Sequence, residues 1–215
     1  MFCCLALLLL AVLQFTNATQ VNRTIDDTRG DSVTGAKPIY VPSIGGVWAS
    51  ANCPECAIKP NQSLAFDGTW TAATFNAQLG LIAIEFSFTG KLQVLHFAYC
   101  TSMNRTNCCV TGTAIYVFFI LSNTVAPGIT TQTECNFTLD GQAAGSFFHA
   151  PSSSVEFVYN ALVFSRSNLQ NTHHLLNIST SGVNHNVFIN FDYAIYTFAS
   201  SLFMTPFSAD FYAQN

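Results

Sequence analysis

The sequence predicts an all-β protein, an antiparallel β-sandwich or jelly roll. The first observation is period-two alternation, which recurs along the chain while helical periodicity is scarce. In the run IAIEFSFT, at 82–89, apolar residues occupy every even position, as a strand with one buried face requires. The second observation is composition: 215 residues that are 50% hydrophobic, with 20 Phe, are enough to build one sizeable core.

Strand-like runs continue along the chain and are separated by polar turns. After 82–89 they occupy 113–121, 135–140, 155–164, 174–179 and 187–196. The breaks between them are rich in Gly, Pro, Ser and Asn: APG at 126–128, DGQAAG at 140–145, HAPSSS at 149–154 and TSGVN at 180–184. About eight short strands spaced in this way are typical of a sandwich or jelly roll.

The first eighteen residues predict a secretory signal peptide. An uncharged apolar run extends from Phe2 to Phe15, too short for a comfortable membrane span, and Thr16 and Ala18 offer a small-residue cleavage site. The alternative is an uncleaved anchor. Secretion agrees with the Asn-x-Ser/Thr sequons of the mature chain, which predict N-glycosylation at Asn22, Asn61, Asn104, Asn136 and Asn177.

Charge and hydropathy exclude some partners. Only 8% of residues are charged, so solubility has to come from neutral polar side chains or attached sugar. A net charge of -4, with seven scattered basic residues, gives no electrostatic footprint for nucleic acid. The stretch 199–215 is an apolar tail, and the nearest candidate for a second span, at 193–207, is interrupted by two serines and a proline. We therefore expect no transmembrane anchor in this chain.

After the signal peptide we expect a single domain. Residues 19–43 are predicted to be an irregular lead-in, and the β-sandwich is predicted at 44–198. The lead-in holds Asp26, Asp27 and Asp31, whose carboxylates are expected to be solvated or to cap turns rather than to bind a cation.

The cysteines predict a structural disulfide rather than a metal site. Cys53 and Cys56 form a Cys-x-x-Cys pair in a secreted chain, which favours a local disulfide. A thioredoxin-like redox pair would need a βαβ context, and a zinc site would need a second Cys-x-x-Cys. The pairing of the remaining cysteines stays open: Cys100, Cys108, Cys109 and Cys135. We expect no metal and no cofactor.

Nothing in the sequence points to catalysis. No Gly-x-Ser-x-Gly occurs, and no Ser, His and Asp set has a distinctive spacing. His173 and His174 are adjacent on a predicted strand, so they face opposite sides and are poorly placed to hold one ion. Carboxylates for glycoside hydrolysis are present, but in ordinary strand and turn contexts: Glu85, Glu134, Glu156, Asp67, Asp140 and Asp192. We expect a protein that is not an enzyme.

A string of motifs resembles one protein family. In order from about residue 25 to 197 the chain contains TIDDTRGDSVTGAKPIYVPS, Trp48, CPEC, AFDGTW, FSFTG, TAIYVFFIL, FTLDG, YNALVF, NTHHLLNISTSG and FDYAIYT. This string is similar to a family of secreted or single-pass membrane proteins from mushroom-forming fungi, whose role is not established. The resemblance implies a galactose-binding-like jelly roll at the cell surface or outside the cell.

The chain departs from that family at three places. Relatives usually have GTWHD where this chain has GTWTA, so Thr71 and Ala72 stand in place of a His-Asp pair. Any binding or chemistry that the pair carries in relatives is therefore expected to be lost in this chain. Relatives often continue into a membrane helix, whereas this chain ends soon after Thr197. Relatives also lack the twenty-two residues 91–112.

The insertion at 91–112 has two explanations. Without it the chain reads IEFSFTGTAIYVFFIL, two strand patterns joined by a tight turn that is typical of a hairpin. Codons for Gly90-Lys91 and Thr111-Gly112 can supply splice donor and acceptor sites, so the hypothesis we favour is a retained intron. The alternative is a disulfide-stapled loop, because the mature chain has six cysteines with the insertion and three without it.

Recognition of carbohydrate is the function that the fold class suggests. Jelly rolls of this type bind sugars through rim loops with an aromatic face, and the candidates for such a face are Trp48, Trp70, Tyr40 and Tyr159. Burial in a Phe-rich core is the competing role for these rings. We expect a secreted glycoprotein ectodomain that binds cell-wall or cell-surface glycans. The alternatives are a glycan-active enzyme and a truncated or mis-spliced copy without independent function.

Overall fold

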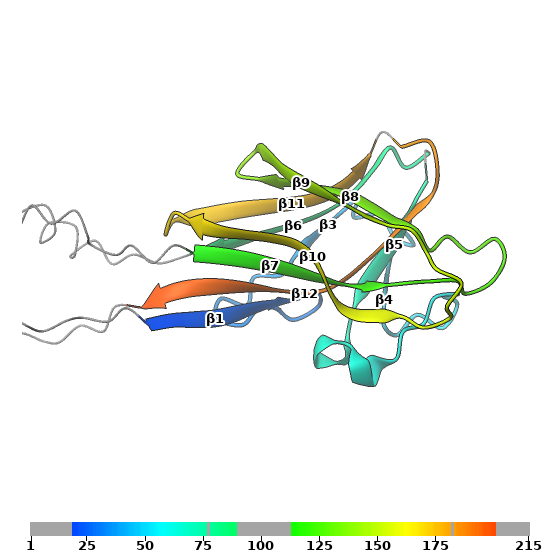
Figure 1. Cartoon of the computed structure of the whole chain (residues 1–215), viewed down its shortest axis with the longest axis horizontal. Helices are drawn as coiled ribbons and strands as arrows, with labels where there is room; N and C mark the ends of the chain where they lie inside the picture. Colours follow the sequence, from blue (N-terminus) through cyan, green and yellow to red (C-terminus); the bar gives the residue numbers. More distant parts are fainter. Residues whose placement is uncertain (1–18, 77, 90–112, 182, 201–215) are drawn as a thin grey trace, which may run out of the picture.

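The computed structural model describes residues 19–76, 78–89, 113–181 and 183–200, and these residues form two antiparallel sheets packed face to face (Figure 1). The larger sheet contains β1 (Thr19–Asp26), β2 (Gly30–Asp31), β4 (Trp48–Ser50), β5 (Thr71–Phe75), β7 (Thr113–Leu121), β10 (Val158–Leu169) and β12 (Val187–Ser200). The smaller sheet contains β3 (Ile39–Val41), β6 (Leu81–Thr89), β8 (Thr133–Leu139), β9 (Gln142–His149) and β11 (His173–Ser181). The predicted all-β sandwich is confirmed.

The strand order is that of a jelly roll. One sheet has the order β10-β7-β12-β1, and the other contains β6-β11-β8-β9. The first and last of these strands, β1 and β12, therefore pair side by side, and the chain crosses between the sheets in the two interleaved Greek keys that define this architecture. Figure 1 shows the two layers, with β9, β11 and β6 in one and β10, β7, β12 and β1 in the other.

The core lies between the inner faces of the sheets. Its largest fully buried side chains are phenylalanines, at positions 75, 119, 137 and 191. The alternation in β6 has the predicted outcome, because Ile82, Ile84, Phe86 and Phe88 are all buried. Two stacked pairs, Phe86 with Phe191 and Phe137 with Phe164, join the sheets through aromatic contacts.

The prediction of an irregular lead-in at 19–43 is wrong. Residues 19–26 form β1, which pairs with β12 along its whole length, and residues 30–31 and 39–41 form β2 and β3. The described sandwich thus starts at Thr19 rather than at residue 44. Ile25, which is fully buried, anchors β1 in the core, while the polar residues around it gave no clean alternation.

The expected hairpin between the strands flanking the insertion is also wrong. β6 lies between β3 and β11 in the smaller sheet, whereas β7 lies between β10 and β12 in the larger one. Residues 91–112 themselves lie outside the described residues, so the intron hypothesis stays a prediction. The same holds for the signal peptide at 1–18, the end of the tail at 201–215, Asn104, Cys100, Cys108 and Cys109. The described residues contain no helix with the length and apolar content that a membrane span needs.

Candidate functional site

A second apolar layer covers part of the outer face of the larger sheet. Residues 51–70, the covering segment, include the 3-10 turns η1 (Gln62–Leu64) and η2 (Phe66–Gly68), which lie beneath this sheet in Figure 1. The segment buries Ile58 and Trp70 against three residues of the sheet: Ala72, Ile120 and Phe188. The predicted disulfide between Cys53 and Cys56 is confirmed and closes a turn within this segment.

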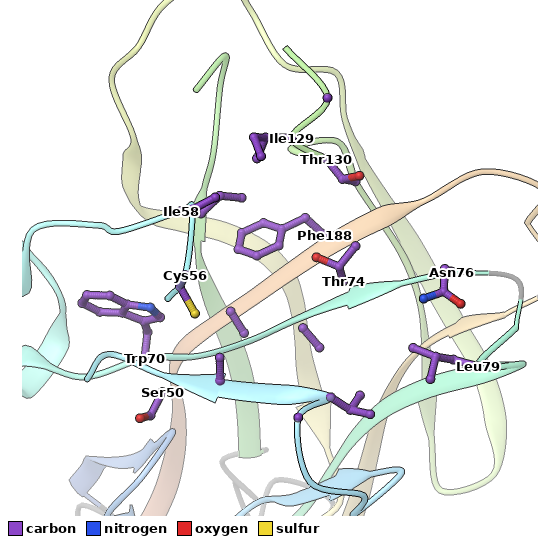
Figure 2. A pocket seen from close by; sticks show the side chains of 17 residues that line it. Ser50, Cys56, Ile58, Trp70, Thr74, Asn76, Leu79, Ile129, Thr130 and Phe188 are labelled. Carbon is purple, nitrogen blue, oxygen red and sulfur yellow. The ribbon is translucent and has the colours of Figure 1, made fainter. Parts of the chain in front are cut away.

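A hollow of about 510 Å³ lies between the covering segment, the loop at 128–130 and strands β4 and β5. Its apolar walls come from Ile58, Trp70, Ile129 and Phe188. Figure 2 shows Ile58 and Phe188 next to one another, with Trp70 at one end of the hollow and Asn76 at the other. The space exists because the residues of β4 and β5 at this place are small: Ala49, Ala72 and Ala73.

The polar groups of the hollow are hydroxyls and an amide. Ser50 and Thr74 are exposed at its rim, and Asn76 and Thr130 are half-buried. No Asp or Glu occurs among the described residues that line it. The arrangement offers apolar contact and neutral hydrogen bonds, which suits an uncharged ligand with both apolar and hydroxyl surfaces.

Behind this hollow lies a buried amide that the sequence analysis missed. Asn190 of β12 is 1% exposed, and within the described part of the chain neither its Nδ2 nor its Oδ1 has a hydrogen-bond partner. It pairs in register with Ala72 and lies on the same face of β12 as Phe188, and both of these residues line the hollow. An Asn in the apolar run VFINF was the clue in the sequence.

The aspartates near the amino terminus form a buried network rather than a solvated group. Asp27 is 2% exposed and accepts hydrogen bonds from the hydroxyls of Thr69 and Thr71, both at 2.6 Å. Asp26 accepts from the backbone N–H groups of Thr28 and Arg29. The expected turn-capping role is therefore confirmed for Asp26 and for Asp31, whose Oδ1 accepts from the backbone N–H groups of Val33 and Thr34. It is wrong for Asp27, which is neither solvated nor a turn cap. Burial raises the pKa of Asp27.

Asp192 extends this network to the covering segment. Its side chain is fully buried and accepts the backbone N–H of Phe66 at 3.0 Å, while its carbonyl accepts the backbone N–H of Asp27 at 3.2 Å. Burial, with the repulsion of Asp27 and Asp26, raises the pKa of Asp192 to about 7. Each carboxylate is bound by groups of the chain itself, so the network clamps residues 66–71 to β1 and β12.

The four predicted aromatic candidates do not form one face. Trp70 is 5% exposed and lines the hollow. Trp48 and Tyr40 pack on each other with ring centroids 4.9 Å apart, and the Tyr40 hydroxyl donates to the carbonyl of Asp27. Tyr159 packs beside the covering segment, where its hydroxyl accepts the backbone N–H of Asn61 at 2.6 Å. Only Trp70 is thus brought to the hollow.

The carboxylates considered for hydrolysis are spread between the surface and the buried network around Asp27 and Asp192. Asp140 binds His174 at 2.7 Å, Glu134 binds His185 at 3.1 Å, and Asp67 binds Arg29 at 2.9 Å. As predicted, the two adjacent histidines face opposite sides, since His174 is buried and His173 is exposed. Within the described ranges no three His, Cys, Asp or Glu side chains are grouped to hold a metal ion.

Fold and site together define a jelly-roll sandwich with a neutral, partly apolar hollow beside its outer layer. No protein-family model matches the chain, and no curated protein matches it. The Agl-KA catalytic domain is similar in structure, with a TM-score of 0.43 and 10% identity over 92% of this chain and 31% of that one.

Two further solved structures are similar at the same distant level. The CBM36-1 domain of a multidomain xylanase from the hindgut metagenome of Trinervitermes trinervoides has a TM-score of 0.32 and 12% identity, over 59% of this chain and 75% of that one. The catalytic domain of a GH87 α-1,3-glucanase in complex with nigerose has a TM-score of 0.38 and 10% identity, over 89% of this chain and 30% of that one. The chain thus spans about a third of the two catalytic domains. At this identity, nothing that those proteins bind or cleave transfers to it.

Proposed function

We propose that the chain is a secreted glycoprotein ectodomain that binds carbohydrate in the hollow and does not cleave it. The observation that carries this proposal is the composition of the hollow. A sugar ring has apolar C–H faces and a ring of hydroxyls, which match the walls formed by Trp70, Ile58 and Phe188 and the hydroxyls of Ser50 and Thr74.

The absence of acidic groups from the described lining favours binding over hydrolysis. A glycosidase needs two carboxyl groups about 5 to 10 Å apart on either side of the scissile bond. Asp27 and Asp192 are two neighbouring buried carboxylates, the pair most similar to a glycosidase site. However, they already accept hydrogen bonds from Thr69, Thr71 and the backbone N–H of Phe66. These carboxylates hold the covering segment in place.

The positions of the sequons support secretion and glycosylation. Asn22, Asn61 and Asn136 are exposed, and Asn177 is half-buried, with its Nδ2 donating to Glu85. The two sequons of the smaller sheet are paired, because Asn177 lies opposite Thr138 and Asn136 lies opposite Ser179. Their side chains project from the outer face of that sheet, so glycans there would leave the hollow beside the other sheet free.

A glycan-array screen with a blocked variant tests the proposal. Thr74→Trp places an indole at the rim of the hollow on an exposed strand position, and Ser146→Trp adds the same ring to β9 in the other sheet. We expect the unmodified chain and Ser146→Trp to retain the same glycan, and Thr74→Trp to lose at least about tenfold in affinity. Equal binding by both variants would place any glycan site elsewhere, and cleavage of the retained glycan would show an enzyme.

A further inference from the structure

An exposed phenylalanine lies beside one of the predicted glycosylation sites. Among the residues whose side chains the structure describes, Phe148 of β9 is the only phenylalanine that is exposed, at 58%. It lies opposite Glu134 of β8, and Asn136, two residues along β8, opens the sequon Asn-Phe-Thr. Buried and accessible positions alternate along β8, so Glu134 and Asn136 share the outer face of the smaller sheet with this ring. A large apolar ring and an attachment point for sugar therefore lie on the same surface.

The register brings Asn136 and Phe148 within reach of one another. Residues diagonal to each other across an antiparallel pair lie about 7 to 8 Å apart, which aromatic side chains can span. The residues directly opposite Asn136 are serines on both sides, Ser179 of β11 and Ser146 of β9. Because both are small, neither of them fills the space between Asn136 and the ring.

The sugar that N-glycosylation attaches has the chemistry to cover this ring. In that reaction the amide nitrogen of Asn136 forms a bond to C1 of N-acetylglucosamine, loses one proton and displaces the diphosphate of the glycan donor. The pyranose ring has C–H groups on its faces, and these make apolar contact with the face of an aromatic ring. Contact between the two removes apolar surface of Phe148 from water and is therefore stabilising.

The second sequon of this sheet directs its glycan toward the other edge. Asn177 of β11 is diagonal to Asn136, and its Nδ2 donates to Glu85 of β6 at 2.7 Å. β6 lies on the side of β11 that is away from β8. Glycosylation leaves one hydrogen on Nδ2, which can keep this bond. The two glycans thus lean in opposite directions, and Phe148 is left for the one at Asn136.

We propose that the first sugar of an N-glycan at Asn136 packs on Phe148 and forms a structural part of the outer face of the smaller sheet. The inference rests on the proposed function in one respect, because it requires a secreted and glycosylated chain. It does not require a ligand in the hollow. β8 and β9 lie at the top of Figure 1, whereas the covering segment beside the hollow lies at the bottom.

A double-mutant cycle on the full chain, secreted from a eukaryotic host, tests the inference. Glycopeptide mass spectrometry reads the occupancy of Asn136, and thermal unfolding compares the parent with Asn136→Gln, Phe148→Thr and the double variant. We expect each single variant to lower Tm by about 2 to 4 °C. The double variant should lose no more than either single one, because both remove the same contact. Threonine keeps the β propensity of the position.

Two controls isolate the contact of the first sugar. An endoglycosidase that leaves only the first N-acetylglucosamine on each asparagine should change the Tm of the parent by less than about 1 °C. Asn22 is the matched sequon: it is exposed on β1 of the other sheet and lies opposite Thr197. Asn22→Gln combined with Phe148→Thr should therefore change Tm additively.

Three results would overturn the inference. An unoccupied Asn136 would remove it together with glycosylation at that site. An occupied Asn136 with additive effects in the cycle would remove the inference alone. A dimer in sedimentation that Phe148→Thr dissociates would assign the ring to a contact between copies of the chain. Glycan binding in the hollow is read separately on the array, where Asn136→Gln should bind as the parent does.

Discussion

The hydroxyl of Thr71 donates to the carboxylate of Asp27 at 2.6 Å, and this bond joins the start of β5 to the end of β1. The two residues are forty-four positions apart. Together with the bond from Thr69, it fixes the segment that leads through Trp70 into the sheet. The motif GTWTA therefore positions the covering segment and one wall of the hollow.

Loss of this hydrogen bond is predicted to destabilise the protein. Thr71→Val keeps the shape of the side chain but leaves the buried Asp27 with one donor fewer, so we expect the free energy of unfolding to fall by about 1 to 3 kcal/mol. Urea denaturation measures the change. Thr74→Val, at an exposed position of the same strand, should change stability by less than about 0.5 kcal/mol. A similar loss of stability in both variants would show that the effect comes from replacing Thr by Val in this strand and not from the hydrogen bond to Asp27.

The stability of the protein is predicted to fall as the pH rises toward neutrality. Asp192 has a folded-state pKa of about 7, above the ordinary value of 3.8, so the folded chain holds a proton that the unfolded chain releases between these two values. The raised pKa of Asp27 acts in the same direction. One such proton corresponds to a slope of roughly 1.4 kcal/mol per pH unit.

Asp192→Asn should remove most of this slope, because its amide oxygen still accepts the N–H of Phe66 but does not ionise. Denaturant unfolding at several values between pH 5 and 7.5, a window that includes the folded-state pKa of about 7, compares the two proteins. Asp31 is a suitable contrast: burial raises its pKa, but the bonds from Tyr196 and from two backbone N–H groups outweigh burial and lower it. Its contribution is therefore lost only in acid. An unchanged slope in Asp192→Asn would contradict the assignment.

The sequence predicted well those strands whose alternation separates core from solvent. β6 is the clearest case, since its even positions are buried and its register with β11 is regular. β1 was missed because TQVNRTID carries few apolar residues, and β12 supplies most of the burial that makes it a strand. Pairing with a strand more than 160 residues away is not visible in local pattern.

The site was harder to predict than the fold. Asn190 faces away from the core, where a polar residue on a strand ordinarily meets solvent. It is buried because the covering segment, more than 100 residues earlier, folds over that face of the sheet. Ala72 lies directly opposite Asn190, and its small side chain helps to leave the hollow open.

The turn between β8 and β9 is predicted to depend on the conformation of Asp140. This residue has a φ of +53°, accepts the N–H of Leu175 at 2.9 Å and binds His174. Asp140→Asn keeps an acceptor and a residue type that tolerates positive φ, whereas Asp140→Ala loses both. We expect the alanine variant to be less stable than the asparagine variant by about 1 to 2 kcal/mol in thermal or urea unfolding. The reverse order would show that neither the bond nor the backbone conformation matters.

Removal of the disulfide is predicted to loosen the covering segment. Cys53→Ser with Cys56→Ser opens a short loop, for which chain entropy predicts a loss of about 2 kcal/mol. Because Cys56 and Ile58 line the hollow, glycan affinity should fall together with stability. Calorimetric unfolding and titration of the double variant measure both. A loss of stability without a loss of glycan affinity would show that the covering segment does not contribute to the ligand site.

Deletion of residues 91–112 tests the retained-intron hypothesis against the topology. β6 and β7 lie in different sheets, and packed sheets are about 10 Å apart. The shortened link Thr89-Gly90-Thr113 reaches at most about 7 Å, so the ends of these strands would have to leave their sheets. We expect the deleted chain to fold with the same glycan binding and to lose the bond between Thr113 and Asn171. Sequencing of the transcript should then show messages without these 66 nucleotides. If every message contains them and the deleted chain does not fold, the segment is a genuine connection between the sheets.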